Sequence, residues 1–208
     1  MADYAALQKE VDRLAVRECD LAPVEARVKK MIAEGIPCRN LDGQYLAEHR
    51  QEILDSVQQH AEEYSLYFHN CAQSTAMALL EWFGLGNMDV IKALSLFPGI
   101  AGTGRVCGGI TGALIAFGLF FTREGADPEL AKKGMRIAQQ YIAAFEGALG
   151  YTHCTDIIEH VILGERINPG ESDASMAAFA QAGGFMKCGL PPGIGSRLAA
   201  GIIIDNAA

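Results

Sequence analysis

The feature that most constrains the fold is the run GRVCGGITGALIAFGLFF, residues 104–121, which holds five glycines, one cysteine and no acidic residue. From position 106 to position 122, 17 consecutive uncharged residues are flanked by arginines. A membrane-spanning helix needs about 20 apolar residues, and the first third of this run is Cys, Gly and Thr. The run therefore predicts a buried central helix over residues 106–121, apolar on all sides, and no membrane span.

The rest of the chain has helical periodicity and no strand pattern. With 208 residues, of which 50% are hydrophobic, the chain is long enough for one compact core. We expect an all-α fold, a compact multi-helix bundle of about eight to nine helices around the Gly-rich helix. A change from charged to small apolar composition divides it into an N-terminal helical extension, residues 1–65, and a compact cysteine-containing domain, residues 66–208.

Local signals place several helix ends. Asn70 is a predicted N-cap for a helix over 71–83 that Gly84 ends, and Asp127-Pro128 opens a helix that runs to about position 149. Thr152 is the predicted cap of the next helix. Residues 41–66 read as one long helix, and residues 183–195 as a loop before the final helix.

Charge excludes one class of function. The net charge is −8 and no Lys/Arg run is longer than two residues, whereas nucleic-acid binding needs a basic face. The N-terminus, MADYAALQKEVDRLAVRECD, is charged throughout and has no signal-peptide core. We therefore expect a cytoplasmic protein.

Six cysteines are present and no two lie closer than 19 positions. The absence of any C-x-x-C excludes zinc ribbons, thioredoxin motifs, ferredoxin runs and covalent c-type haem attachment. Structural disulfides are not expected in the reducing cytosol. Metal binding, redox chemistry or simple burial remain.

Four of the cysteines stand at special places: Cys71, Cys107 and Cys154 at predicted helix starts, and Cys188 in a glycine-proline loop. A helix N-terminus lowers the pKa of a thiol and so favours the thiolate, which is the form that ligates metals. Four thiolates suit one iron–sulfur cluster as cofactor, [2Fe-2S] or [4Fe-4S], with a role in electron transfer or storage. Two alternatives stay open: a cofactor-free thiol–disulfide redox protein that uses two of these cysteines, and a structural zinc site.

Other residues near these cysteines have ordinary interpretations. Cys19 and Cys38 lack a Gly-rich setting and read as inert buried side chains. His69 and His153 could replace a cysteine ligand, but a capping role is favoured. Arg105 could offset the charge of a cluster or lie on the surface, and the helix after Cys154 carries Asp156 and Glu159 on a solvated face.

The order of four segments, FHNCAQSTAMALLEWFGL, GTGRVCGGITGALIAFGLFF, YTHCTDII and MKCG, resembles the C_GCAxxG_C_C family, which is named for its cysteine pattern and taken to be redox-active. The resemblance covers about residues 66–190. Gly109 stands where members usually carry Ala, and Val106 departs from the literal GCA spelling. The resemblance implies redox chemistry or cluster binding in anaerobic metabolism, and it names no substrate.

The N-terminal helices carry apolar stripes that a domain of about 140 residues does not need for its own core. We expect them to wrap a second copy of the chain in a homodimer, with Leu46, Ile53 and Val57 buried against it. A separate redox partner protein is also implied, without any residue to identify it.

Overall fold

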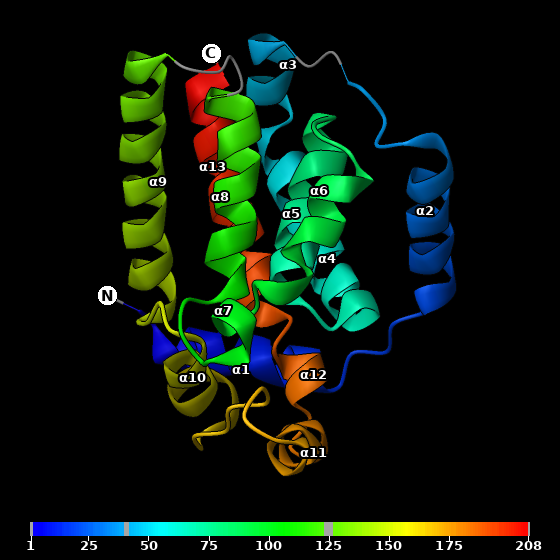
Figure 1. Ribbon diagram of the computed structural model, residues 1–208, viewed down its shortest axis with the longest axis vertical. Coiled ribbons are helices and arrows are strands. Elements are labelled where there is room, and N and C mark those ends of the chain that lie inside the picture. Colours follow the sequence, from blue (N-terminus) through cyan, green and yellow to red (C-terminus); the bar gives the residue numbers. More distant parts are fainter. Residues whose placement is uncertain (1, 40–41, 123–126, 208) are drawn as a thin grey trace.

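The computed structural model describes residues 2–39, 42–122 and 127–207. These residues form helices and no strand, so the all-α prediction is confirmed (Figure 1). The described residues contain thirteen α-helical segments, one 3₁₀ turn and one π-helix. This exceeds the expected eight to nine helices because several short segments lie where the sequence indicated loops.

The elements follow one another along the chain with mostly short connections. Their bounds are α1 (Tyr4–Ala15), α2 (Leu21–Glu34), α3 (Gly43–Glu48), α4 (Arg50–Phe68), α5 (Cys71–Phe83), α6 (Met88–Ala93), η1 (Leu94–Leu96), α7 (Gly99–Gly102), α8 (Gly108–Phe121), α9 (Pro128–Leu149), α10 (Cys154–Ile157), η2 (Ile158–Leu163), α11 (Asp173–Gln181), α12 (Gly184–Lys187) and α13 (Leu190–Ala207).

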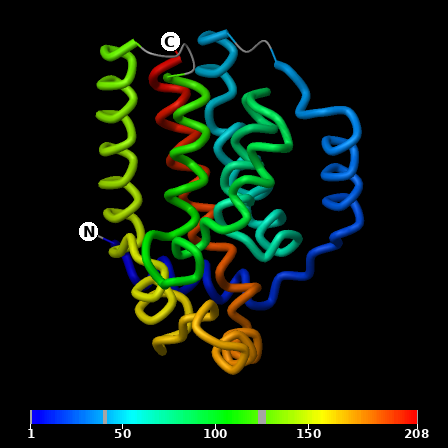
Figure 2. The backbone as a smooth tube through the Cα atoms, viewed as in Figure 1, coloured from blue at the N-terminus to red at the C-terminus, as the bar shows by residue number. Residues whose placement is uncertain are grey.

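The apolar run forms α8, which lies between α5, α9 and α13 (Figures 1 and 2). Its first half is buried, including Gly108, Gly109 and Gly112. A Cβ added at Gly112 would overlap the carbonyl oxygen of Ala72 in α5, so the glycines let the two helices approach closely. The prediction of a buried central helix is confirmed for this half, while Leu119 in the second half remains partly exposed.

Two predicted boundaries are wrong. The single helix expected over 41–66 breaks at His49, which separates α3 from α4. The final helix begins at Leu190, well before the expected start, because Pro191 and Pro192 fall in its first turn. Proline is tolerated there since the first N–H groups of a helix have no intrahelical acceptor.

The apolar stripes of the N-terminal helices are buried within their own chain and are not available to another chain. Leu46, Ile53 and Val57 are at most 2% exposed and belong to the same hydrophobic core as α5, α8 and α13. The prediction that these three residues bury against a partner subunit is therefore wrong. Helix α4 packs between α5 and α13 of its own chain, because its apolar side has a nearer partner there.

The lengths and packing of the helices also bear on the question of a membrane span. Among the described residues, no helix combines the length and the apolar character that crossing a bilayer requires. The apolar surface of α8 is covered by α5, α9 and α13. Figure 1 shows α1, α10, α11 and α12 gathered at one end of this bundle.

Candidate functional site

The four singled-out cysteines come from four separate elements at that end of the bundle. Cys71 is the first residue of α5, Cys107 is the N-cap of α8, and Cys154 is the first residue of α10. Cys188 lies between α12 and α13, where its N–H donates to the carbonyl of Gly184 at 2.8 Å. The predicted helix-start positions of the first three are confirmed.

Cys71 is held by a capped helix start. The Asn70 side chain accepts from the N–H of Gln73 at 3.0 Å, and its amide donates to the carbonyl of Ser95 at 3.0 Å. Gly108 faces this turn, where a Cβ would overlap the Cys71 sulfur. Glycine at that position therefore lets the start of α8 meet the start of α5.

Cys107 and Cys154 are tied together through their backbones. The N–H of Cys107 donates to the carbonyl of Thr152 at 2.9 Å, and the N–H of Cys154 donates to the carbonyl of Arg105 at 2.6 Å. Val106 and His153 form the isolated antiparallel bridge between the two segments. Thr152 was expected to cap the following helix, but its carbonyl serves this bridge and the N-cap is His153.

Three of the four cysteines line one cavity of about 300 Å³, namely Cys71, Cys154 and Cys188. Each of these three has partly exposed surface. Cys107 is only 3% exposed and is not among the cavity-lining residues. Its thiol lies within hydrogen-bonding reach of the Cys71 sulfur. The structure thus brings Cys71 and Cys107 into contact and places the other two on the wall of the same cavity.

The pKa of the Cys71 thiol is lowered. The hydrogen bond from Cys107 is the main cause, and it outweighs burial, which acts in the opposite direction. Backbone N–H groups of Gly108, Cys71 and Ala72 add to the lowering. This is the behaviour expected of a thiol at a helix N-terminus.

The other three thiols behave differently from the prediction. The pKa of Cys107 is raised well above its usual range, first because its proton is shared with Cys71 and then because it is buried. Burial raises the pKa of Cys154 to about 12 and that of Cys188 well above its usual range. The expectation of low pKa values at Cys107 and Cys154 is therefore wrong, because the hydrogen bond with Cys71 and then burial outweigh the helix terminus at Cys107, and burial outweighs it at Cys154.

The arrangement of the candidate donor atoms decides whether they can hold a metal. Within the described ranges, no group of three or more His, Cys, Asp and Glu side chains is gathered closely enough to hold a metal ion. The candidate ligands are four thiols, and soft sulfur donors select iron–sulfur clusters or zinc. The chemistry of these side chains therefore fits such a group. In the structure they stand as one contacting pair and two neighbours on the cavity wall.

The two histidines have ordinary roles. The ring of His69 stacks on Phe185 with centroids 4.4 Å apart, and His69 also lines the cavity. His153 caps α10 through its backbone and makes no side-chain capping bond. Arg105 is exposed, which fits its surface interpretation.

Residues outside the cavity also have clear positions. Asp156 and Glu159 both pair with Arg166, at 3.0 Å and 2.8 Å, on an exposed face. Cys19 is partly exposed and Cys38 is exposed, so the expectation that both are buried is wrong. Neither lines the cavity.

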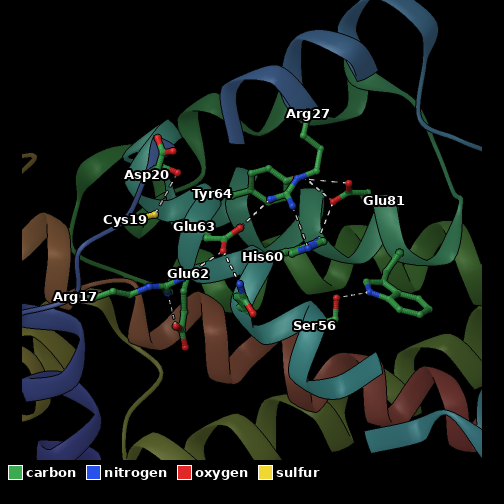
Figure 3. A network of polar contacts seen from close by, with 12 residues as sticks. Arg17, Cys19, Asp20, Arg27, Ser56, His60, Glu62, Glu63, Tyr64 and Glu81 are labelled. Atoms are coloured by element: carbon green, nitrogen blue, oxygen red, sulfur yellow. Dashed lines mark hydrogen bonds and ion pairs between the residues drawn. The ribbon is translucent and has the colours of Figure 1, made fainter. Parts of the chain in front are cut away.

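Sequence reasoning missed a polar network between α1, α2, α4 and α5 (Figure 3). Glu62, 3% exposed, accepts from Arg13 and Arg17 at 2.9 Å each. Tyr64 donates to Glu81 at 2.6 Å and accepts from Arg27 at 2.9 Å. The only signal in the sequence was the pair of carboxylates in HAEEYS, which helical spacing alone could not assign to a buried face.

Residues 69–189 match the family model described as "Putative redox-active protein (C_GCAxxG_C_C)". Because the match covers more than half of the chain, the protein belongs to this redox-active family, and the resemblance inferred from the sequence is confirmed. No curated protein and no solved structure matches the chain.

Proposed function

We propose that the protein is an iron–sulfur redox protein that transfers or stores electrons in the cytoplasm. Cys71, Cys107, Cys154 and Cys188 would hold the cluster, [2Fe-2S] or [4Fe-4S]. The observation that carries the proposal is that three cysteines of the family signature, Cys71, Cys154 and Cys188, line one cavity, and that the fourth, Cys107, contacts Cys71. When bound, the cluster would supply one-electron redox chemistry.

The chain's own contribution is to prepare sulfur donors. Cys71 is stabilised as a thiolate by N–H donors and by the Cys107 thiol. The other three sulfurs hold their protons, which a metal would displace on binding. Small side-chain movements around the cavity would be needed for all four sulfurs to share one centre, because no three are gathered closely enough in the described residues.

Iron content after anaerobic purification tests the proposal. Wild-type protein should be coloured and contain iron and acid-labile sulfide, and Cys107→Ser should remove most of both. Cys38→Ser is the matched control, since Cys38 is exposed and outside the cavity. Equal iron in both variants would overturn the proposed ligand set, and a colourless protein with stoichiometric zinc would favour the structural zinc site.

A thiol–disulfide function is the second candidate, favoured by the contact between Cys71 and Cys107. The Cys71 thiolate and the Cys107 thiol would form an S–S bond, with loss of one proton and two electrons to an external disulfide or other two-electron oxidant. A colourless, metal-free protein in which both Cys71→Ser and Cys107→Ser abolish a reversible two-electron midpoint would support this function over the first.

Homodimerisation remains part of the proposal, although its predicted contacts at Leu46, Ile53 and Val57 are withdrawn. Two-fold homodimers are the commonest soluble assembly, and a dimer would bring two redox centres within reach of one another. Light scattering on the full chain at micromolar concentration tests it, and a monomer at all concentrations would contradict it.

A further inference from the structure

The cavity beside the cysteines extends beyond them. Its volume of about 300 Å³ is within the usual range for small-molecule sites, about 300–1,000 Å³. Away from the thiols its walls include Phe179, Phe185, Ile158 and Leu96. Ligand sites are usually apolar and aromatic in this way, with a few polar groups that fix orientation.

No Lys, Arg, Asp or Glu is among the described residues that line the cavity. The anionic form of the Cys71 sulfur, which also lines it, is favoured. An anionic ligand such as a carboxylate or phosphate would find no cation to offset the cost of leaving water, and a cationic ligand would find no carboxylate. The lining therefore favours an uncharged ligand.

Ser65 supplies one polar group for such a ligand. It lies in the last turn of α4, is 5% exposed and lines the cavity. Its hydroxyl makes no side-chain hydrogen bond with another described residue. Ser74 is similarly buried, yet its hydroxyl donates to the carbonyl of Asn70 at 2.6 Å. The buried hydroxyl without a partner in the described residues is that of Ser196, so the Ser65 hydroxyl is reached from the cavity and can bond to a ligand there.

The walls are held in backbone conformations that non-glycine residues rarely adopt. His69 has φ 48° and Ala101 has φ 55°, and both line the cavity. The loop that carries Ala101 is fixed to a second wall, because the Asn168 amide donates to the carbonyl of Gly102 at 3.0 Å. Such strain persists only where surrounding contacts enforce it, and it concentrates at ligand sites.

The rim of the cavity is apolar and open to solvent. Leu96 is 74% exposed and Met176 is 41% exposed, and both line the cavity. Phe97 and Ile100, beside this rim in the chain, are 37% and 39% exposed. Exposed apolar side chains gathered at one place mark binding sites more often than chance.

We propose that this cavity binds a small uncharged, mostly apolar organic molecule with one oxygen that hydrogen-bonds to Ser65. The molecule lies against Cys71, Cys154 and Cys188, beside the sulfurs proposed to hold the redox centre. Its binding does not depend on the proposed function.

Three probes of similar size test the site on the full-length, anaerobically purified protein by NMR titration: phenol, toluene and benzoate. Phenol and toluene should shift resonances of the cavity residues, phenol more tightly, and benzoate at neutral pH should not bind there. Ser65→Ala should weaken phenol about three- to tenfold, the value of one hydrogen bond, and leave toluene unchanged. Benzoate binding as tightly as phenol would overturn the proposal.

A variant at the rim provides the second test. Met176→Trp places a larger side chain at the rim of the cavity and should narrow its entrance. Binding of both neutral probes should weaken at least about tenfold, an effect as large as the loss of one well-packed apolar contact. Met135→Trp is the matched control, because Met135 is 68% exposed and is not a cavity residue. Equal binding by the two variants would overturn the proposal. If the protein contains iron but binds no probe, only the small-molecule site is refuted. If it binds the probes but contains no iron, only the iron–sulfur cluster is refuted.

Discussion

The two polar regions of the molecule bury their groups in opposite ways. At the interface of α1, α2, α4 and α5, carboxylates such as Glu62 and Glu81 each meet at least two donors (Figure 3). At the cysteine end, three of the thiols and the Ser65 hydroxyl line a cavity that has no Lys, Arg, Asp or Glu among its described lining residues. Polar groups whose hydrogen bonds are made within the protein hold helices together. Polar groups that can still form hydrogen bonds face a cavity and are available to a ligand.

The comparison also separates rigid from adaptable parts. The network joins residues far apart in the sequence, as in the bond from Arg27 to Tyr64, and so fixes α2 on α4. The cysteine end depends instead on close backbone approach at Gly108 and on the bridge between Val106 and His153. Each support predicts a distinct response to substitution.

The largest effect is expected at the contact between α8 and α5. Gly108→Ala places a methyl group against the Cys71 sulfur and the backbone of Ala72, so we expect a loss of about 3 kcal/mol in the free energy of unfolding, at the upper end for overpacking. Gly147→Ala is the control, because it lies in the exposed part of α9 with nothing within 4 Å. It should stabilise the chain by about 0.5–1 kcal/mol. Urea unfolding at pH 7 measures both, and equal stability would mean that α8 does not need glycine here.

A smaller loss is expected in the polar network. Glu81→Gln removes the carboxylate that accepts from Tyr64 and His60. We expect the free energy of unfolding at pH 7 to fall by about 2 kcal/mol. This loss is below that of a fully buried ion pair, because Arg27, which also pairs with Glu81, is partly exposed. Glu52→Gln on the exposed side of α4 should change stability by a few tenths of a kcal/mol.

The same variant has a defined pH dependence. Burial alone would raise the pKa of Glu81, but hydrogen bonds from His60 and Tyr64 bring it below its usual range. The stabilisation is therefore present above the ordinary carboxyl pKa of about 4.3 and is lost as pH falls through the lower folded value. Unfolding measured from pH 7 to pH 3 should show the gap between wild type and Glu81→Gln closing below about pH 4. A constant gap would show that the carboxylate charge is not responsible.

The smallest effect compares two serines that are both 0% exposed. Ser74 donates to the carbonyl of Asn70, whereas the Ser196 hydroxyl in α13 is the buried side-chain polar atom without a partner among the described residues. Ser196→Ala should therefore stabilise the chain by about 1 kcal/mol, and Ser74→Ala should destabilise it by about as much. Thermal unfolding of both variants checks the sign, and a destabilised Ser196→Ala would indicate a bound water or ligand at that hydroxyl.

Sequence by itself determined the features that depend on neighbouring residues. Asn70, Cys71 and Gly84 predicted α5 to the residue, since an N-cap and a left-handed glycine act within one turn. Asp127-Pro128 predicted the start of α9 in the same way. The segments NCAQS and CGGITGALIAFGL, with the order of the four cysteines, were sufficient for the family, because a family pattern is itself a property of sequence.

Only the tertiary structure decided the features that depend on what a side chain meets across the fold. Cys107 and Cys154 stand at helix starts as predicted, yet the hydrogen bond with Cys71 raises the pKa of Cys107 and burial raises that of Cys154. Leu46 lies on an apolar stripe that could have faced a second chain, and the positions of α5 and α13 placed it in the chain's own core. Desolvation and packing depend on distances between segments far apart in the sequence, and local patterns carry no information about those distances.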